Sequence, residues 1–113
     1  MTEADTVELA ERFPGIADYR RLREATGLSP KSEAAAERGL ASTTYGVSLL
    51  RDGEVVGMGR IVGDGGCFHI VVDIAVDPEW QGRGLGKRIM DALDAWLRAN
   101  AAPTAHVSLF ADG

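Results

Sequence analysis

The sequence has one cysteine, no long apolar run and fewer basic than acidic residues, and each shortage excludes something. With Cys67 alone, the chain can form no internal disulfide. Its apolar stretches are far shorter than the roughly 20 residues that cross a bilayer. Its first five residues are polar and acidic, unlike the start of a signal peptide. These features predict a protein of the reducing cytoplasm.

The charge balance narrows the range of partners. The chain carries 12 Lys and Arg against 17 Asp and Glu, which gives a net charge of −5. Proteins that bind nucleic acids or anionic membranes non-specifically need a basic excess, so we expect neither as a partner. An acidic surface is compatible with a cationic substrate such as an amine, although acidity is common among proteins of many functions.

Length and composition are those of one ordinary globular domain. A chain of 113 residues can bury one hydrophobic core. Hydrophobic residues make up 45% of it and charged residues 26%, both typical of globular proteins. We therefore treat residues 1–113 as a single domain.

Three segments carry the signals of helices. Residues 16–26 place apolar side chains on one side and precede Gly27, a common helix stop. Residues 32–40 are rich in Ala and Glu and begin at Ser32, a good N-cap residue. The strongest signal covers residues 85–99, where apolar residues recur at helical spacing on one stripe: Leu85, Ile89, Leu93, Trp96 and Leu97.

Five segments have the pattern of strands. Asp52-Gly53 stands between two of them, and this dipeptide is a strong hairpin signal. Residues 68–76 are almost continuously apolar, which predicts a central strand buried on both faces. The order β-α-α-β-β-β-α-β predicts an α/β fold (mixed α+β) with a central sheet. The expected strands are residues 7–12, 44–51, 54–62, 68–76 and 106–110.

A glycine-rich turn, residues 81–86, separates the central strand from the longest helix. Such a turn leaves backbone N–H groups free at the positive end of the helix dipole, which suits phosphate. The spacing fits neither a Walker A loop nor a Rossmann fingerprint. The plain alternative is a flexible turn with no ligand, and the spacing alone leaves that alternative open.

The surrounding residues resemble one family. The segment from Val71 to Lys87 reads Val-Val-Asp-Ile-Ala-Val-Asp-Pro-Glu-Trp-Gln-Gly-Arg-Gly-Leu-Gly-Lys. It resembles the signature of the GCN5-related N-acetyltransferases (GNAT), in which Gln/Arg-x-x-Gly-x-Gly/Ala follows a strand. Gln81, Gly84 and Gly86 stand at its three motif positions. The stretch with Gly57 and Arg60 is similar to the family as well. The resemblance implies a mixed, mostly antiparallel sheet flanked by helices.

The resemblance also implies a site for acetyl-CoA and no metal. The strand before the loop would offer main-chain groups to the pantetheine arm, and the loop amides would bind the pyrophosphate. Charged side chains of Arg83, Lys87 and Arg88 would lie near the phosphates, or would simply be solvated. The implied cofactor-binding residues are Ile74, Ala75, Val76, Gln81, Gly82, Arg83, Gly84, Leu85, Gly86 and Lys87.

The resemblance implies direct transfer of an acetyl group to a primary amine. Such a reaction needs a group that removes the amine proton and a donor for the developing oxyanion. Asp73, on the apolar central strand, is the candidate base, with a structural role as the equal alternative. The Val76 N–H is the candidate oxyanion donor by resemblance. His69 is a weaker candidate base, His106 is expected at a strand end, and Cys67 has no basic partner.

The sequence departs from the family after residue 113, where GNAT proteins normally add a helix and two strands. We expect a truncated chain, a homodimer that completes the sheet, or a shortened homologue. A non-catalytic CoA-binding or interaction module is therefore the alternative to an enzyme. The acceptor amine, whether a small molecule or a protein, stays open, since Glu33 and Glu37 could attract a cation or simply face solvent.

Overall fold

The computed structural model describes residues 6–110, which form a five-stranded sheet in the order β1-β2-β3-β4-β5. Neighbouring strands are antiparallel except β4 and β5, which are parallel. The strands are β1 (Glu8–Ala10), β2 (Tyr45–Arg51), β3 (Glu54–Gly63), β4 (Phe68–Val76) and β5 (His106–Leu109). The predicted fold class is confirmed, and every predicted strand is present with ends that shift by at most a few residues.

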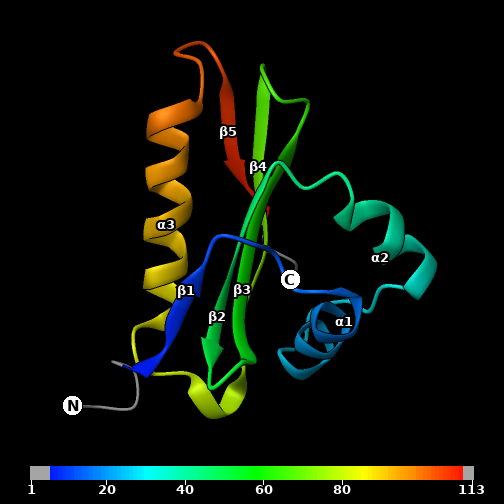
Figure 1. The fold of residues 1–113 in the computed structure, drawn as a ribbon. Coiled ribbons are helices and arrows are strands. Elements are labelled where there is room, and N and C mark those ends of the chain that lie inside the picture. The colour runs from blue at the N-terminus through cyan, green and yellow to red at the C-terminus, as the bar shows by residue number, and fades with distance from the viewer. Residues whose placement is uncertain (1–5, 111–113) are drawn as a thin grey trace.

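Helices cover both faces of the sheet (Figure 1). Helix α3 (Leu85–Asn100) lies along one face, while α1 (Ile16–Ala25) and α2 (Glu33–Leu40) lie on the other. The buried apolar residues form two clusters, one on each face of the sheet. One cluster includes Ile89 and Leu93 of α3, and the other includes Leu22 of α1. The sheet therefore separates an α3 side from an α1/α2 side.

Helix α3 packs close to the sheet because β3 contributes glycine beneath it. The predicted stripe is buried, with Leu85, Ile89 and Leu93 at most 1% exposed. A Cβ placed on Gly59 would lie 2.4 Å from Cγ2 of Ile89. No larger residue fits there without moving the helix. This close approach fixes where the start of α3, and the loop before it, lie relative to β4.

A β-bulge at Asp73 reverses the faces of β4. The pairing of β3 with β4 shifts between Met58 and Arg60, and Asp73 adopts a left-handed φ of 58°. Before the bulge, Val71 packs in the cluster on the α3 side; after it, Ala75 packs in the cluster on the α1/α2 side. One extra residue moves alternate side chains to the opposite face. The bulge therefore turns Asp73 toward α1.

Two details differ from the sequence predictions. The expectation that β4 is buried on both faces is wrong, because buried residues alternate with half-buried ones along the strand and Phe68 is 55% exposed. A short 3-10 helix, η2 (Pro78–Trp80), follows β4 and was not predicted. The N-cap at Ser32 is confirmed, since its Oγ accepts a hydrogen bond from the Ala35 N–H at 3.1 Å. None of the helices within residues 6–110 has the length and apolar composition needed to cross a bilayer.

Candidate functional site

The loop between η2 and α3 turns sharply at two glycines. Gly82 and Gly84 have φ values of 78° and 77°, a left-handed conformation that glycine adopts without strain. Gly84 is the N-cap of α3 and offers no side-chain cap. The loop thus delivers the chain into the helix with bare main-chain groups at its tip.

The amides of this loop are available to an external acceptor. The first helical hydrogen bond of α3 runs from the Arg88 N–H to the Gly84 carbonyl at 3.2 Å. No acceptor among residues 6–110 takes the N–H of Gly82, Gly84, Leu85, Gly86 or Lys87. These donors gather at the positive end of a 16-residue helix, which is where an anion is stabilised.

Gln81 has a positioning role in the loop. Its Nε2 donates to the Val76 carbonyl at 3.0 Å, which ties the loop to the end of β4. This hydrogen bond holds the loop at a fixed distance from the end of β4, and so helps to position the loop amides.

The basic side chains near the loop have different surroundings. Arg83 stacks over Trp80, with its Cζ 4.6 Å from the ring centroid, and Lys87 pairs with Asp91 at 2.8 Å. Asp91 raises the pKa of the exposed Lys87 ammonium. Arg88 donates to the Val7 carbonyl at 2.9 Å and is partly buried. Arg88 is therefore an anchor for the segment before β1 and is not simply solvated, while its place near the phosphates stays a prediction.

Beside the loop, β4 has an open edge. Among residues 6–110, strand β5 pairs with β4 only as far as Val71, whose carbonyl accepts from the Phe110 N–H at 2.9 Å. The register and the bond from the Asp77 N–H to the Val56 carbonyl turn the main-chain groups of Ala75 toward β3. By alternation, those of Ile74 and Val76 face the open side.

The three residues predicted to contact the pantetheine arm differ in their main-chain directions. The N–H and C=O of Ala75 face the neighbouring strand β3 and not the open edge. Ile74 and Val76 keep theirs directed outward, apart from the Val76 carbonyl that Gln81 engages. The Val76 N–H is thus a donor directed at the gap between β4 and β5.

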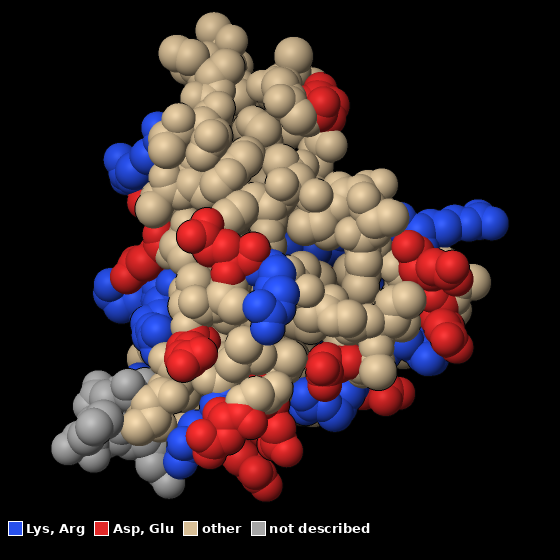
Figure 2. Space-filling model, viewed as in Figure 1, with Lys and Arg blue, Asp and Glu red and all other residues tan. Residues whose placement is uncertain are grey.

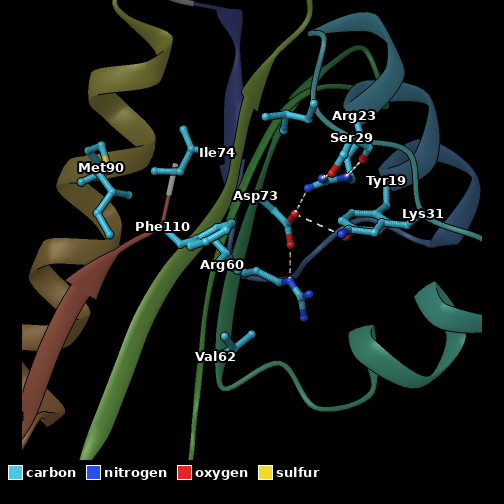
Figure 3. A pocket seen from close by; sticks show the side chains of 13 residues that line it. Tyr19, Arg23, Ser29, Lys31, Arg60, Val62, Asp73, Ile74, Met90 and Phe110 are labelled. Carbon is cyan, nitrogen blue, oxygen red and sulfur yellow. Dashed lines mark hydrogen bonds and ion pairs between the residues drawn. The ribbon is translucent and has the colours of Figure 1, made fainter. Parts of the chain in front are cut away.

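A cavity of about 600 Å³ wraps around this open edge. Figure 3 shows its two ends. The apolar end includes Ile74, Met90 and Phe110, while the polar end includes Lys31 and the group around Asp73. The complete lining is Tyr19, Arg23, Leu28, Ser29, Lys31, Arg60, Val62, Val72, Asp73, Ile74, Met90, Leu109 and Phe110.

Three side chains converge on the Asp73 carboxylate (Figure 3). Oδ1 accepts from Nη1 of Arg23 at 2.5 Å and from the Tyr19 hydroxyl at 3.3 Å, and Oδ2 accepts from Nε of Arg60 at 2.7 Å. The side chains of Asp73 and Arg23 are each 5% exposed. Both oxygens of this carboxylate are engaged by guanidinium groups, so the contacts favour the structural alternative for Asp73.

Tyr19 is held as a hydrogen-bond donor. Burial, reinforced by the charge of Asp73, raises the pKa of its hydroxyl above the usual value of 10.0. It therefore stays protonated near neutral pH and donates to Asp73.

The remaining sequence candidates lie elsewhere. His69 is 2% exposed, and its ring meets the Trp96 ring edge-on with centroids 5.8 Å apart. His106 is the first residue of β5, as predicted, and Cys67 is exposed. Glu33 and Glu37 line neither the cavity at the open edge of β4 nor the smaller cavity beside it.

The family model for the acetyltransferase (GNAT) family matches residues 8–111. The chain belongs to the GNAT family of acetyltransferases. A comparison with the curated proteins gave no match.

Solved structures of other GNAT proteins have the same fold. A protein of unknown function from meticillin-resistant Staphylococcus aureus, described as a "probable acetyltransferase", is 38% identical, with a TM-score of 0.88 over 94% of this chain and 80% of that one. A GNAT acetyltransferase from Streptococcus pneumoniae is 25% identical, with a TM-score of 0.72 over 93% and 75%. One from Brucella melitensis, solved in complex with acetyl-CoA, is 20% identical, with a TM-score of 0.69 over 95% and 77%.

Sequence reasoning missed the arginines of this GNAT site. Arg23 follows Tyr19 by four residues, so it lies on the apolar side of α1, where a charged residue is unusual. That position was the available signal for a buried ion pair. The ion pair between Arg23 and Asp73 could not be predicted from the sequence, because it depends on a β-bulge that has no local sequence pattern.

Proposed function

We propose that this GNAT protein is an acetyl-CoA-dependent N-acetyltransferase that acts on a primary amine. The observation that carries the proposal is the row of loop amides that have no acceptor among residues 6–110, directly beside the open edge of β4. These features fit the two ends of a CoA molecule. Loop amides from Gly82 to Lys87 would bind the pyrophosphate, and the outward groups of Ile74 and Val76 would pair with the pantetheine amides.

When bound, acetyl-CoA supplies an acyl group activated as a thioester. The chain's own contribution is positioning and electrostatics. The Val76 N–H faces the gap and would donate to the oxygen on which negative charge develops as the amine attacks the carbonyl carbon and the carbon–sulfur bond breaks. With Asp73 engaged by two arginines, the amine proton would pass to water rather than to this carboxylate.

The same engagement of Asp73 favours a second candidate, a CoA-binding module without catalysis. A site that lacks a free base beside the open strand edge can still bind CoA. The two candidates share the binding step and differ only in turnover. A homodimer that completes the sheet is a further part of the proposal and is compatible with either.

Thermal melting with CoA tests the shared step. Free CoA at about 100 times its dissociation constant should stabilise the fold by about 2.7 kcal/mol, which is a rise of several degrees in Tm. No rise at millimolar CoA would reject both candidates. Acetyl-CoA-dependent thiol release with a panel of amines then separates them, since only the enzyme accelerates release when an amine is added.

A further inference from the structure

The polar end of the cavity carries more positive than negative charge. Among the described residues of its lining, Lys31 and Arg60 contribute cationic groups beside the ion pair of Arg23 and Asp73, and Asp73 is the only carboxylate. A neighbouring cavity of about 160 Å³ shares Lys31 and Arg60, and none of the described residues that line it is acidic. The protein as a whole is acidic, and on the face shown in Figure 2 acidic and basic groups are interspersed over the lower part. The cationic excess is thus a property of the cavity.

Two donors in the cavity have no protein acceptor. Arg60 uses Nε for Asp73, and its Nη1 donates to the Gly39 carbonyl and the Thr43 hydroxyl, both at 3.0 Å. Among residues 6–110, no acceptor takes its Nη2, and no carboxylate pairs with the Lys31 ammonium. The Arg60 side chain is 10% exposed, so its unpaired donor is partly desolvated and a bound anion relieves that cost, while the exposed Lys31 ammonium lines the same cavity.

We propose that the acceptor of this protein is a small primary amine that also carries a carboxylate or a phosphate, and that Lys31 and Arg60 bind this anionic group. The inference rests on the proposed function and names its substrate class. The cavity runs from these two side chains to Ile74 on the open edge of β4. An acceptor bound by its anionic group at the polar end therefore directs its amine toward the place proposed for acetyl transfer.

The cationic lining also assists the chemistry. Nearby positive charge disfavours an ammonium ion and favours the neutral amine, which is the form that attacks a thioester. The positive charge of the cavity thus supplies part of what a general base would do, because it favours loss of the amine proton. This role is open to Lys31 and Arg60 even though Asp73 neutralises part of the charge of Arg60.

Matched acceptors test the inference. We would compare β-alanine with β-alaninamide, and phosphoethanolamine with ethanolamine, by acetyl-CoA-dependent thiol release. The anionic member of at least one pair should have a kcat/KM higher by about tenfold or more, because the free energy of a hydrogen bond to a charged group corresponds to that factor. The pair with the larger ratio distinguishes carboxylate from phosphate. Equal values within both pairs would overturn the inference.

Two variants that each remove one positive charge test whether the preference for anionic acceptors depends on Lys31. Lys31 is exposed and has no salt bridge within residues 6–110, so Lys31→Gln should fold normally and lower the anion preference severalfold, mainly through the KM of the acceptor. Arg38→Gln removes the same charge from an exposed position of α2 outside both cavities, and should keep the preference. Identical behaviour of the two variants would overturn the role of Lys31.

A binding measurement separates the inference from the proposed function. N-acetyl-β-alanine and its amide, the expected products, are titrated into the full chain with CoA present and followed by NMR. Selective binding of the acid that Lys31→Gln weakens supports the inference even if no amine is acetylated, in which case only the proposed function fails. Unselective binding, or none, overturns the inference.

Discussion

At the scale of single residues, Asp73 connects the fold to the site. Its backbone makes the bulge in β4, and its side chain joins α1 to β3 through Arg23 and Arg60. The cavity wall therefore depends on one buried carboxylate. Removing one partner from a buried ion pair is far more costly than removing an exposed pair, because the remaining charge stays uncompensated.

Asp73→Asn tests whether this residue is structural. Asn tolerates the left-handed φ of 58° and keeps the size of the side chain, so the substitution removes mainly the charge. Arg23 and Arg60 then lose their contacts with a buried negative charge, and the free energy of unfolding should fall by about 3–5 kcal/mol. Urea unfolding measures the loss.

A matched control is Asp94→Asn, which breaks the exposed pair with Arg98 and should cost less than about 1 kcal/mol. The structural role would be contradicted by an Asp73→Asn protein of normal stability that has lost turnover alone, as expected of a catalytic base.

Gly84→Ala tests the loop amides. Any residue with a Cβ pays about 1–2 kcal/mol for the left-handed conformation at Gly84, so the free loop should relax and binding must restore its shape. CoA affinity should then fall about fivefold to thirtyfold, measured by calorimetry.

Gly86→Ala is the control for this loop variant. Gly86 lies within α3, does not have positive φ, and a Cβ there meets no atom within 4 Å. The variant should keep the affinity for CoA and stabilise the helix slightly. Equal losses in Gly84→Ala and Gly86→Ala would contradict the proposed role of the loop conformation.

At the scale of elements, the turn between β3 and β4 is organised by Asp64. Its carboxylate accepts from the N–H groups of Gly66, Cys67 and Phe68 at 2.8–3.0 Å. These bonds, that of Gly66 first, hold the pKa of the carboxyl below its usual value of 3.8. A lowered pKa in the folded state means that the stabilisation is complete above 3.8 and is lost as the pH falls through the folded-state value.

Asp64→Asn should therefore destabilise the protein at pH 7, and the difference from the wild type should shrink at about pH 3. Urea unfolding of both proteins at the two pH values gives the comparison. Glu37→Gln, which removes a carboxylate that has no hydrogen bond among the described residues, should show no such pH-dependent difference. A constant difference between Asp64→Asn and the wild type at both pH values would contradict the role of the charge.

The elements were predictable because each has a local pattern. Local sequence patterns predicted the apolar stripe of α3, the Asp52-Gly53 hairpin and the Ser32 N-cap, and the structure confirms all three. The short helix η2 and the bulge at Asp73 were not predicted. For the bulge, pairing with the neighbouring strand decides where an extra residue is tolerated. The site divides in the same way: the loop is local in sequence, while the Asp73 group joins residues about 50 positions apart.

At the scale of the whole molecule, charge is unevenly distributed. In Figure 2, charged side chains gather over the lower part of the face shown, whereas the upper part, around β5 and the end of α3, has few. Large apolar side chains are exposed on and beside β5: Phe68, Val107, Leu109 and Phe110 are 46–65% exposed. Among the described residues β5 pairs with β4 alone, so its other edge has unpaired main-chain groups. Such an edge promotes association with another strand.

The homodimer proposal predicts self-association through β5. Light scattering of the full chain should give the mass of one copy at low micromolar concentration and approach that of two copies as the concentration rises. Val107→Lys places a charge in the middle of the edge strand, which opposes pairing, and should hold the protein at one copy with its fold intact. Thr104→Lys adds the same charge in the loop before β5 and should still dimerise. If the wild type has the mass of one copy even at millimolar concentration, or if Val107→Lys dimerises as readily as Thr104→Lys, the edge of β5 is not the interface.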